Sequence, residues 1–324
     1  MLRISRRDMI VSASLAATVF GLDKRLTLLG ASPAAAAAAE AIDAGFYKFK
    51  VGDIEVTALY DGIWEKDHDP GFIKDVSVED TKKALVAGGL KPDFVPITFS
   101  IMVAKIGGKL VMFDAGTGGQ VSPKAGLMMS KGMAAAGIDP TKIETILVTH
   151  IHPDHVFGLL SKENALVFPQ AEVVVGSKEH AFWTDPALAG KMPEGMKGMV
   201  DRQQQVFAAL KNIRKIEADV EVMPGVRSIA TNGHTPGHTT FQLTSGKDVL
   251  YVLGDVSNIP ALFLKHPNWH AIFDMDGDMA EKTRHTMMDR VIAEGAMIAG
   301  YHYPFPAAGK VAKDGDGYAF TPAA

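Results

Sequence analysis

Four side chains that bind metal ions well fall within six residues of the chain, in the segment His150-Ile151-His152-Pro153-Asp154-His155. This segment directly follows an apolar run, Ile143 to Val148, that predicts a buried strand. The fold must therefore place the end of that strand where imidazole and carboxylate groups can converge, and zinc accepts both. The alternative is a histidine-rich surface loop or a set of core histidines bonded to backbone carbonyls. Because the chain has no cysteine, any metal is held by histidine and carboxylate.

The pattern of apolar residues predicts two series of strands, each followed by helices. The predicted strands are Phe46–Phe49, Ile54–Leu59, Thr98–Lys105, Leu110–Phe113, Ile143–Val148, Glu172–Val175, Val226–Ala230, Thr239–Leu243, Val249–Leu253 and Met297–Tyr301. The predicted helices are Val78–Ala87, Met128–Ala136, Ser177–Phe182, Gly198–Lys211 and Glu281–Glu294, with a loop around the first of them from Asp61 to Pro96. This order predicts two βα layers packed face to face in one domain, rather than a single parallel sheet.

The amino-terminal segment predicts export. Ser5-Arg6-Arg7-Asp8 precedes an apolar stretch from Met9 to Gly21, and the alanine-rich run 34–39 offers several A-x-A cleavage sites. We therefore expect a twin-arginine (Tat) signal over residues 1–40, a folded domain over residues 41–324, and a periplasmic or secreted protein. The alternative of a membrane anchor is disfavoured because thirteen apolar residues fall short of the ~20 that cross a bilayer. No stable membrane span is expected in the mature form.

The charge of the predicted mature chain disfavours nucleic acid as a partner. Residues 1–39 hold five basic and two acidic side chains, so their removal changes the formal net charge from −4 to −7. Proteins that bind nucleic acid need a basic patch or stripe to neutralise phosphates. The rest of the chain shows no such cluster.

The spacing His-x-His-x-Asp-His resembles the signature of the metallo-β-lactamase fold superfamily, and three later segments agree with it. They are Gly233-His234-Thr235-Pro236-Gly237-His238-Thr239, Leu253-Gly254-Asp255, and Gly300-Tyr301-His302-Tyr303-Pro304-Phe305-Pro306. The resemblance implies an α/β fold, a four-layer αβ/βα sandwich of two mixed β-sheets flanked by helices. It also implies a metal-dependent hydrolase.

The same resemblance implies two divalent metal ions, with zinc as the metal. By it, His150, His152 and His234 hold one ion, Asp154, His155 and His302 hold the other, and Asp255 bridges both. A pair of ions ~3.5–4 Å apart can activate a shared water and clamp the oxygen that becomes negative during attack. The resemblance therefore makes Asp154 and Asp255 catalytic residues around a hydroxide that bridges the metals.

Two further polar residues receive supporting roles. Asp114, in Phe113-Asp114-Ala115-Gly116, resembles the Asp-x-Gly turn of the family, whose carboxylate orients a ligand histidine without binding the metal. The alternative is an ordinary turn aspartate. His238 lies four residues after His234 in a Pro-Gly turn and is expected to be structural.

Several segments are similar to the branch of the superfamily that contains methyl parathion hydrolase and quorum-quenching lactonases. They are Gly45-Phe46-Tyr47, Val51 to Leu59, Asp61-Gly62, His234 to Thr240 and Gly315 to Pro322. This branch implies hydrolysis of a lactone or other neutral ester, acyl-homoserine lactones included, by a lactonase or arylesterase. The alternative is a phosphotriesterase acting on organophosphate triesters. A β-lactamase or a non-catalytic zinc-binding protein is less favoured. A homodimer is compatible with these expectations.

The chain departs from that branch at two positions. Asn258 stands where many acyl-homoserine lactonases have a tyrosine, three residues after the bridging aspartate, and Phe157-Gly158 replaces a glycine pair. We expect Phe157, Asn258 and Trp183 to contact the substrate, with Phe157 narrowing the pocket. Further candidates for its walls are Phe94, Phe99, Phe182 and Trp269.

Export can be tested with residues 1–44 fused to a reporter that functions only when it is exported folded. We expect export of the reporter, and we expect it to be lost when Arg6 and Arg7 are both replaced by lysine, because the twin-arginine receptor reads the arginine pair. Reporter activity in the periplasmic fraction measures this. Equal export of the two fusions would overturn the assignment.

Overall fold

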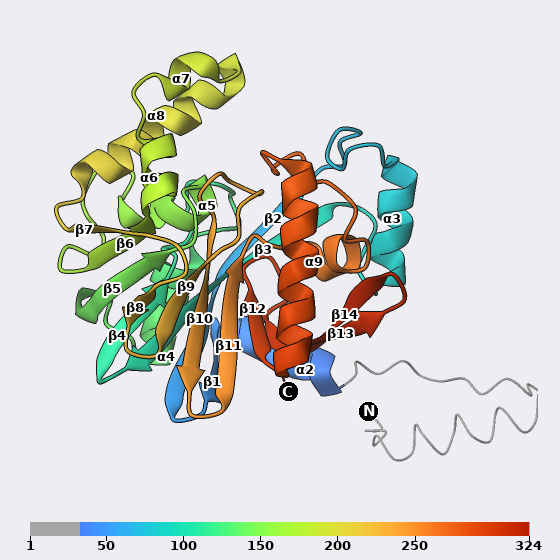
Figure 1. Cartoon of the computed structure of the whole chain (residues 1–324), viewed down its shortest axis with the longest axis horizontal. Helices are drawn as coiled ribbons and strands as arrows, with labels where there is room; N and C mark the ends of the chain where they lie inside the picture. The colour runs from blue at the N-terminus through green and yellow to red at the C-terminus, as the bar shows by residue number, and fades with distance from the viewer. Residues whose placement is uncertain (1–32, 324) are drawn as a thin grey trace, which may run out of the picture. The chain divides into compact units, whose positions relative to one another are not determined.

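Two seven-stranded sheets, with helices on their outer sides, make up residues 33–323, the part of the chain that the computed structural model describes (Figure 1). Residues 37–324 form one compact unit. The predicted export signal falls mainly on residues 1–32, outside the described residues, and stays a prediction. Helix α2 (Pro33–Ala44) covers the alanine-rich run.

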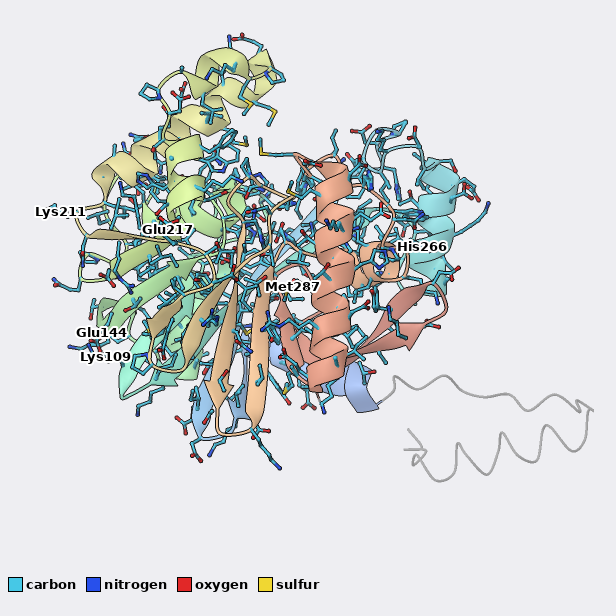
Figure 2. The ribbon with its side chains drawn as sticks, in the orientation of Figure 1. Lys109, Glu144, Lys211, Glu217, His266 and Met287 are labelled. Atoms are coloured by element: carbon cyan, nitrogen blue, oxygen red, sulfur yellow. The ribbon has the colours of Figure 1, made fainter. Side chains whose placement is uncertain are left out.

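The first sheet runs in chain order from β1 to β7. Neighbouring strands are antiparallel from β1 to β4 and parallel from β4 to β7. On its surface Lys109 of β4 and Glu144 of β5 form an ion pair at 3.3 Å (Figure 2). The strands are β1 (Phe46–Val51), β2 (Ile54–Lys66), β3 (Val95–Ile106), β4 (Lys109–Phe113), β5 (Ile143–Val148), β6 (Glu172–Gly176) and β7 (Ile213–Ile216).

The second sheet also follows chain order, from β8 at one edge to β14 at the other. Its neighbours are antiparallel except β11 and β12, which helix α9 connects in parallel. The strands are β8 (Glu221–Met223), β9 (Val226–Ala230), β10 (Thr239–Ser245), β11 (Asp248–Gly254), β12 (Met297–Gly300), β13 (Ala308–Asp314) and β14 (Gly317–Pro322).

The helices begin and end where the sequence offers caps. Ser77 accepts a hydrogen bond from the Asp80 backbone N–H at 3.0 Å at the start of α3, and Gly295 ends α9 with a φ of 62°. No helix in the described range is both long and apolar enough to cross a membrane. The helices are α3 (Val78–Ala87), α4 (Met133–Ala136), α5 (Pro153–Val156), α6 (Ser177–Trp183), α7 (Leu188–Lys191), α8 (Glu194–Ala209) and α9 (Gly277–Glu294), with π-helical turns η1 (Met128–Gly132) and η4 (Ile259–Leu264) and 3₁₀ turns η2 (Pro140–Lys142) and η3 (Phe157–Leu159).

Alternating side chains of the buried strands build two cores. Ile146 and Val148 of β5 pack on the helix side of the first sheet, in the same core as Phe207 of α8. Leu147 points the opposite way and packs with Phe241 of the second sheet. The strand is therefore apolar on both faces, as a strand between two covered faces must be. This arrangement confirms the predicted α/β fold with two mixed sheets flanked by helices.

Most predicted elements are present, and the differences have local causes. Strand β2 continues to Lys66 in the region predicted as loop, paired with β3 across a bulge between Tyr60 and Gly62. Helix 128–136 begins as a π-helix. The prediction missed β7, β8, β13 and β14, which lie at or next to sheet edges, where short strands carry charged residues and lose the alternating pattern.

Candidate metal centre

The His150-to-His155 segment lies at the carboxyl end of β5, as predicted. His150 and His152 project to one side of the turn, while Ile151 between them is fully buried in the core. Pro153 opens α5, and Asp154 and His155 follow in the first turn of this helix. The short helix therefore brings both side chains close to the preceding histidines, and the ring centroids of His150 and His155 lie 4.0 Å apart.

Two sets of side chains converge at this strand end. The first ligand group comprises His150, His152, His234 and Asp255, and the second ligand group comprises Asp154, His155 and His302; within each group the candidate ligand atoms lie within 4.8 Å of one another. Asp255 also contacts the second group, with Oδ1 at 3.3 Å from His155 Nε2 and Oδ2 at 3.2 Å from His302 Nε2. All seven side chains predicted as ligands are thus brought together, with Asp255 between the two groups.

Ring nitrogens of the first ligand group face one another at short distances. His152 Nδ1 lies 3.0 Å from His150 Nε2 and 2.9 Å from His234 Nε2. A single proton on His152 Nδ1 can serve at most one of these contacts, so lone pairs are left pointing at a common centre. Nearby, His155 Nε2 and Asp255 Oδ1 are buried without any hydrogen-bond partner. Converging, unpaired N and O atoms are what a divalent metal needs.

In three of the ligand rings the opposite ring nitrogen is hydrogen-bonded, which fixes the tautomer. His155 Nδ1 bonds Asp114 Oδ2, His234 Nδ1 bonds Asp274 Oδ1, and His302 Nδ1 bonds the Thr98 carbonyl, each at 2.8 Å. A ring that donates from Nδ1 keeps the lone pair of Nε2 free for a metal. The residues present therefore fit divalent metal ions.

Burial and the neighbouring carboxylates have opposite effects on the pKa of the histidines. Burial lowers the pKa of His302 and His234, but Asp255 and the neighbouring carboxylates outweigh it and raise the pKa of His302 to about 10 and that of His234 to about 9. Burial, aided by the His234 ring, lowers the pKa of His152 to about 3. Metal ions compete with protons for such ring nitrogens, so metal binding here releases protons.

Asp114 lies where its carboxylate can orient candidate ligand rings, and its predicted role stays a prediction. It follows β4 with a φ of 62° and accepts hydrogen bonds from the Thr149 backbone N–H at 2.7 Å and the Thr149 hydroxyl at 2.8 Å, besides its contact with His155. The Thr149 oxygen in turn lies 3.0 Å from His150 Nδ1. Asp114 is therefore both a turn residue and the support of two ligand rings.

Several supporting residues were not found from the sequence. Asp274 joins His234 to the buried Arg284, whose Nη2 lies 3.3 Å from Asp274 Oδ2. Tyr301 stacks on the His155 ring, with centroids 3.7 Å apart, and donates to the Asp154 carbonyl at 2.6 Å. The position of Tyr301, next to a ligand, was the only available signal. His238, expected to be structural, accepts a hydrogen bond at Nε2 from the Asp255 backbone N–H at 3.0 Å.

A cavity of about 460 Å³ opens onto both ligand groups. Of the residues predicted as pocket walls, Phe99, Trp183 and Asn258 line it. Phe157 is placed differently from the prediction, because η3 turns its side chain into the core beside the first sheet, so it does not narrow the cavity. The remaining lining comes from apolar side chains that were not predicted: Trp64, Phe72, Ile97, Val121, Pro153, Met192, Met196, Met199, Ile259, Phe263, Ala271, Ile272, Phe273 and Met275.

Comparisons with known proteins agree with this geometry. A family model described as the metallo-beta-lactamase superfamily matches residues 94–297. The structure is similar to that of AidC, described as a dizinc quorum-quenching lactonase in complex with a product (TM-score 0.81, 25% identity, 86% of this chain and 98% of that chain). It is also similar to hydrolase AbOPH of the beta lactamase superfamily (TM-score 0.80, 29% identity, 87% of this chain and 98% of that chain).

Curated relatives match over a shorter stretch. Ribonuclease Z of Pyrococcus horikoshii is 37% identical over 75 residues, which is 23% of this chain and 21% of that protein, and ribonuclease Z of Pyrococcus furiosus is 36% identical over 75 residues. The chain thus spans about a fifth of the length of these relatives. The family match and the full-length structural similarity together decide the class. The chain belongs to the metallo-β-lactamase superfamily and is a metal-dependent hydrolase.

The role of Asp114 can be tested with Asp114→Asn, which keeps a residue type that tolerates positive φ. We expect zinc affinity to fall by about 10–100-fold, because the amide cannot accept from all three donors and the ligand rings lose their orientation. Chelator competition measures the affinity. Ser77→Ala is the control, because loss of this distant helix cap costs about 1 kcal/mol of stability. An equal loss of affinity in both variants would show that Asp114 acts only through stability.

Proposed function

We propose that the protein is a binuclear metal-dependent hydrolase of lactones or other neutral esters. The observation that carries this proposal is the wall of the cavity, whose charged lining residues are limited to the predicted ligands; none of its lining residues is lysine or arginine. A substrate that enters such a cavity is neutral and largely apolar, because an anionic group would find no cationic side chain there. The same feature disfavours a polyanion such as RNA.

The two ligand groups supply the chemistry that ester hydrolysis requires. When bound, two divalent ions would lower the pKa of a coordinated water and polarise the bond under attack. Asp255 contributes to both groups, and Asp154 completes the second. Asn258 lines the cavity, where its side-chain N–H can donate a hydrogen bond to the substrate carbonyl, and its buried Oδ1 has no hydrogen-bond partner.

The similarity to AidC supports a lactone as the substrate, because that protein is described with N-hexanoyl-L-homoserine as its product. Exposed apolar side chains at Met196, Ile272 and Met275 continue the cavity wall outward, with exposures of 39%, 58% and 44%. We therefore propose lactones that carry an apolar chain as the preferred substrates. We also propose that the enzyme acts after export, as the Arg6-Arg7 segment suggests.

A phosphotriesterase is the second candidate, and one observation favours it. Aromatic side chains of Trp64, Phe72, Phe263 and Phe273 form a connected cluster in the wall, which suits an aryl leaving group. The sequence predicted that Phe157 narrows the pocket, which would disfavour bulky triesters. Phe157 does not line the cavity, so this argument against a phosphotriesterase no longer applies. Relative activity on the two substrate classes decides between the candidates.

The binuclear assignment predicts close to two metal equivalents per chain after gentle purification. His152→Ala should remove one equivalent and nearly all turnover, because it deletes a ring nitrogen at the centre of the first ligand group. Elemental analysis and a chromogenic ester assay measure these two properties. Active protein with less than one equivalent would contradict the binuclear assignment.

The substrate class predicts a ranking across a panel of lactones with apolar chains, p-nitrophenyl esters, paraoxon, nitrocefin and RNA. We expect kcat/KM to be highest for lactones and to rise with chain length, since each buried methylene contributes about 0.8 kcal/mol. Met196→Glu should remove the chain-length dependence. Val86→Glu is the control, because Val86 is an exposed apolar residue (57%, against 39% for Met196) that does not line the cavity. Faster hydrolysis of paraoxon than of every lactone would establish the second candidate instead.

A further inference from the structure

Glu179 is a fully buried carboxylate with four hydrogen-bond donors around it. Its Oε1 accepts from the Ile151 backbone N–H at 2.9 Å and the Trp183 indole N–H at 2.7 Å. Its Oε2 accepts from the Thr235 hydroxyl at 2.8 Å and the Gly237 backbone N–H at 2.9 Å. Each oxygen is thus paired with two donors, and this carboxylate is not one of the predicted metal ligands.

The four donors belong to three parts of the metal centre. Ile151 lies between the ligands His150 and His152, and Thr235 and Gly237 follow the ligand His234. Trp183 lines the cavity and meets the His152 ring edge-on, with ring centroids 5.5 Å apart. One side chain therefore joins the two loops that supply all three histidines of the first ligand group, together with a wall of the substrate cavity.

The contact between these parts leaves little room for movement. A Cβ on Gly237 would lie 2.2 Å from the Glu179 backbone nitrogen, so the loop after His234 packs directly on α6. On the other side of the Ile151 peptide, Gln203 of α8 donates to the Ile151 carbonyl. Helix α8 contacts both α5 and α6. The backbone of Ile151, which lies between His150 and His152, is therefore hydrogen-bonded at both its N–H and its C=O.

The charge of Glu179 also favours a cation nearby. Burial raises the pKa of Glu179, and the four hydrogen bonds that it accepts oppose this rise, because all four partners are donors and suit the ionised carboxylate. None of the ion pairs found among residues 33–323 involves Glu179, so no lysine or arginine neutralises it. A negative charge bonded to the ligand loops adds a favourable electrostatic contribution to metal binding.

We propose that Glu179 is a positioning residue that fixes the His150–His152 and His234 loops relative to each other and thereby sets the metal affinity of the first ligand group. The inference rests on the metal ligation described under Proposed function. The second ligand group is oriented by other partners, Asp114 on His155 and the Thr98 carbonyl on His302. The effect of Glu179 should therefore be selective for one group.

Glu179→Gln tests this selectivity when it is placed in two backgrounds. In His302→Ala only the first ligand group is complete, and in His152→Ala only the second is complete. We expect Glu179→Gln to weaken Zn²⁺ binding about 10–100-fold in the first background, because the amide nitrogen meets two donors and the loops separate. In the second background the change should stay within about twofold, as for independent sites. Chelator competition with Zn²⁺ alone measures both, without any substrate.

Three further measurements exclude a merely structural effect. Thr235→Val removes one donor to Oε2 and should weaken zinc binding in the same background, but less than Glu179→Gln. Trp183→Phe keeps the ring in the wall and removes only the indole N–H, so its effect should also be smaller. Thermal unfolding of the metal-free proteins, with Ser77→Ala as a destabilised reference, separates stability from affinity.

The outcomes are distinguishable from a failure of the proposed function. Equal losses in the two backgrounds, or no loss in either, would overturn the role of Glu179 while wild-type zinc binding leaves the ligand assignment intact. Wild-type protein that binds no zinc would overturn the ligand assignment and this inference together.

Discussion

The structure depends on keeping several buried nitrogen and oxygen lone pairs free of protein partners. A buried polar atom without a partner costs about 1–3 kcal/mol, so such atoms do not converge by chance. Here this cost falls on the inward atoms, because the rings of His155, His234 and His302 are each hydrogen-bonded at their other nitrogen. These outer partners come from different segments, after β4, in β3 and before α9. Orienting the rings therefore ties distant parts of both sheets to one point.

The mixed topology of the sheets explains how ligands far apart in the sequence reach that point. Strands β11 and β12 are parallel neighbours, so Asp255 and His302, which follow their carboxyl ends, lie at the same edge. Strand β5 delivers His150 from the first sheet to the same place. His234 arrives by a tight loop between β9 and β10, which is fixed by its packing against α6. Each ligand loop thus starts from a rigid strand.

A feature could be predicted from the sequence when its signal lies within a short stretch of residues. The six-residue ligand motif and the strand before it are local patterns, and they were predicted with their bounds. Asp274, Arg284 and Glu179 are single polar residues that each bond a partner at least 28 residues away, so no local pattern marks these contacts. Phe157 shows the converse case. It adjoins the motif, but a 3₁₀ turn decides which way its side chain points.

The cavity wall contains a cluster of packed aromatic rings and a group of methionine side chains. These two parts of the wall differ in how readily their side chains adapt to a substrate. On one side Trp64, Phe72, Phe263 and Phe273 pack ring against ring, and Arg284 lies over the Phe263 ring while its pairing with Asp274 anchors the segment before α9. On the other side the wall consists of methionines 192, 196 and 199, whose unbranched side chains adapt to varied apolar groups. If substrates bind in this cavity as proposed, we expect the packed aromatic rings to select them by shape and the methionines to tolerate variation in the attached chain.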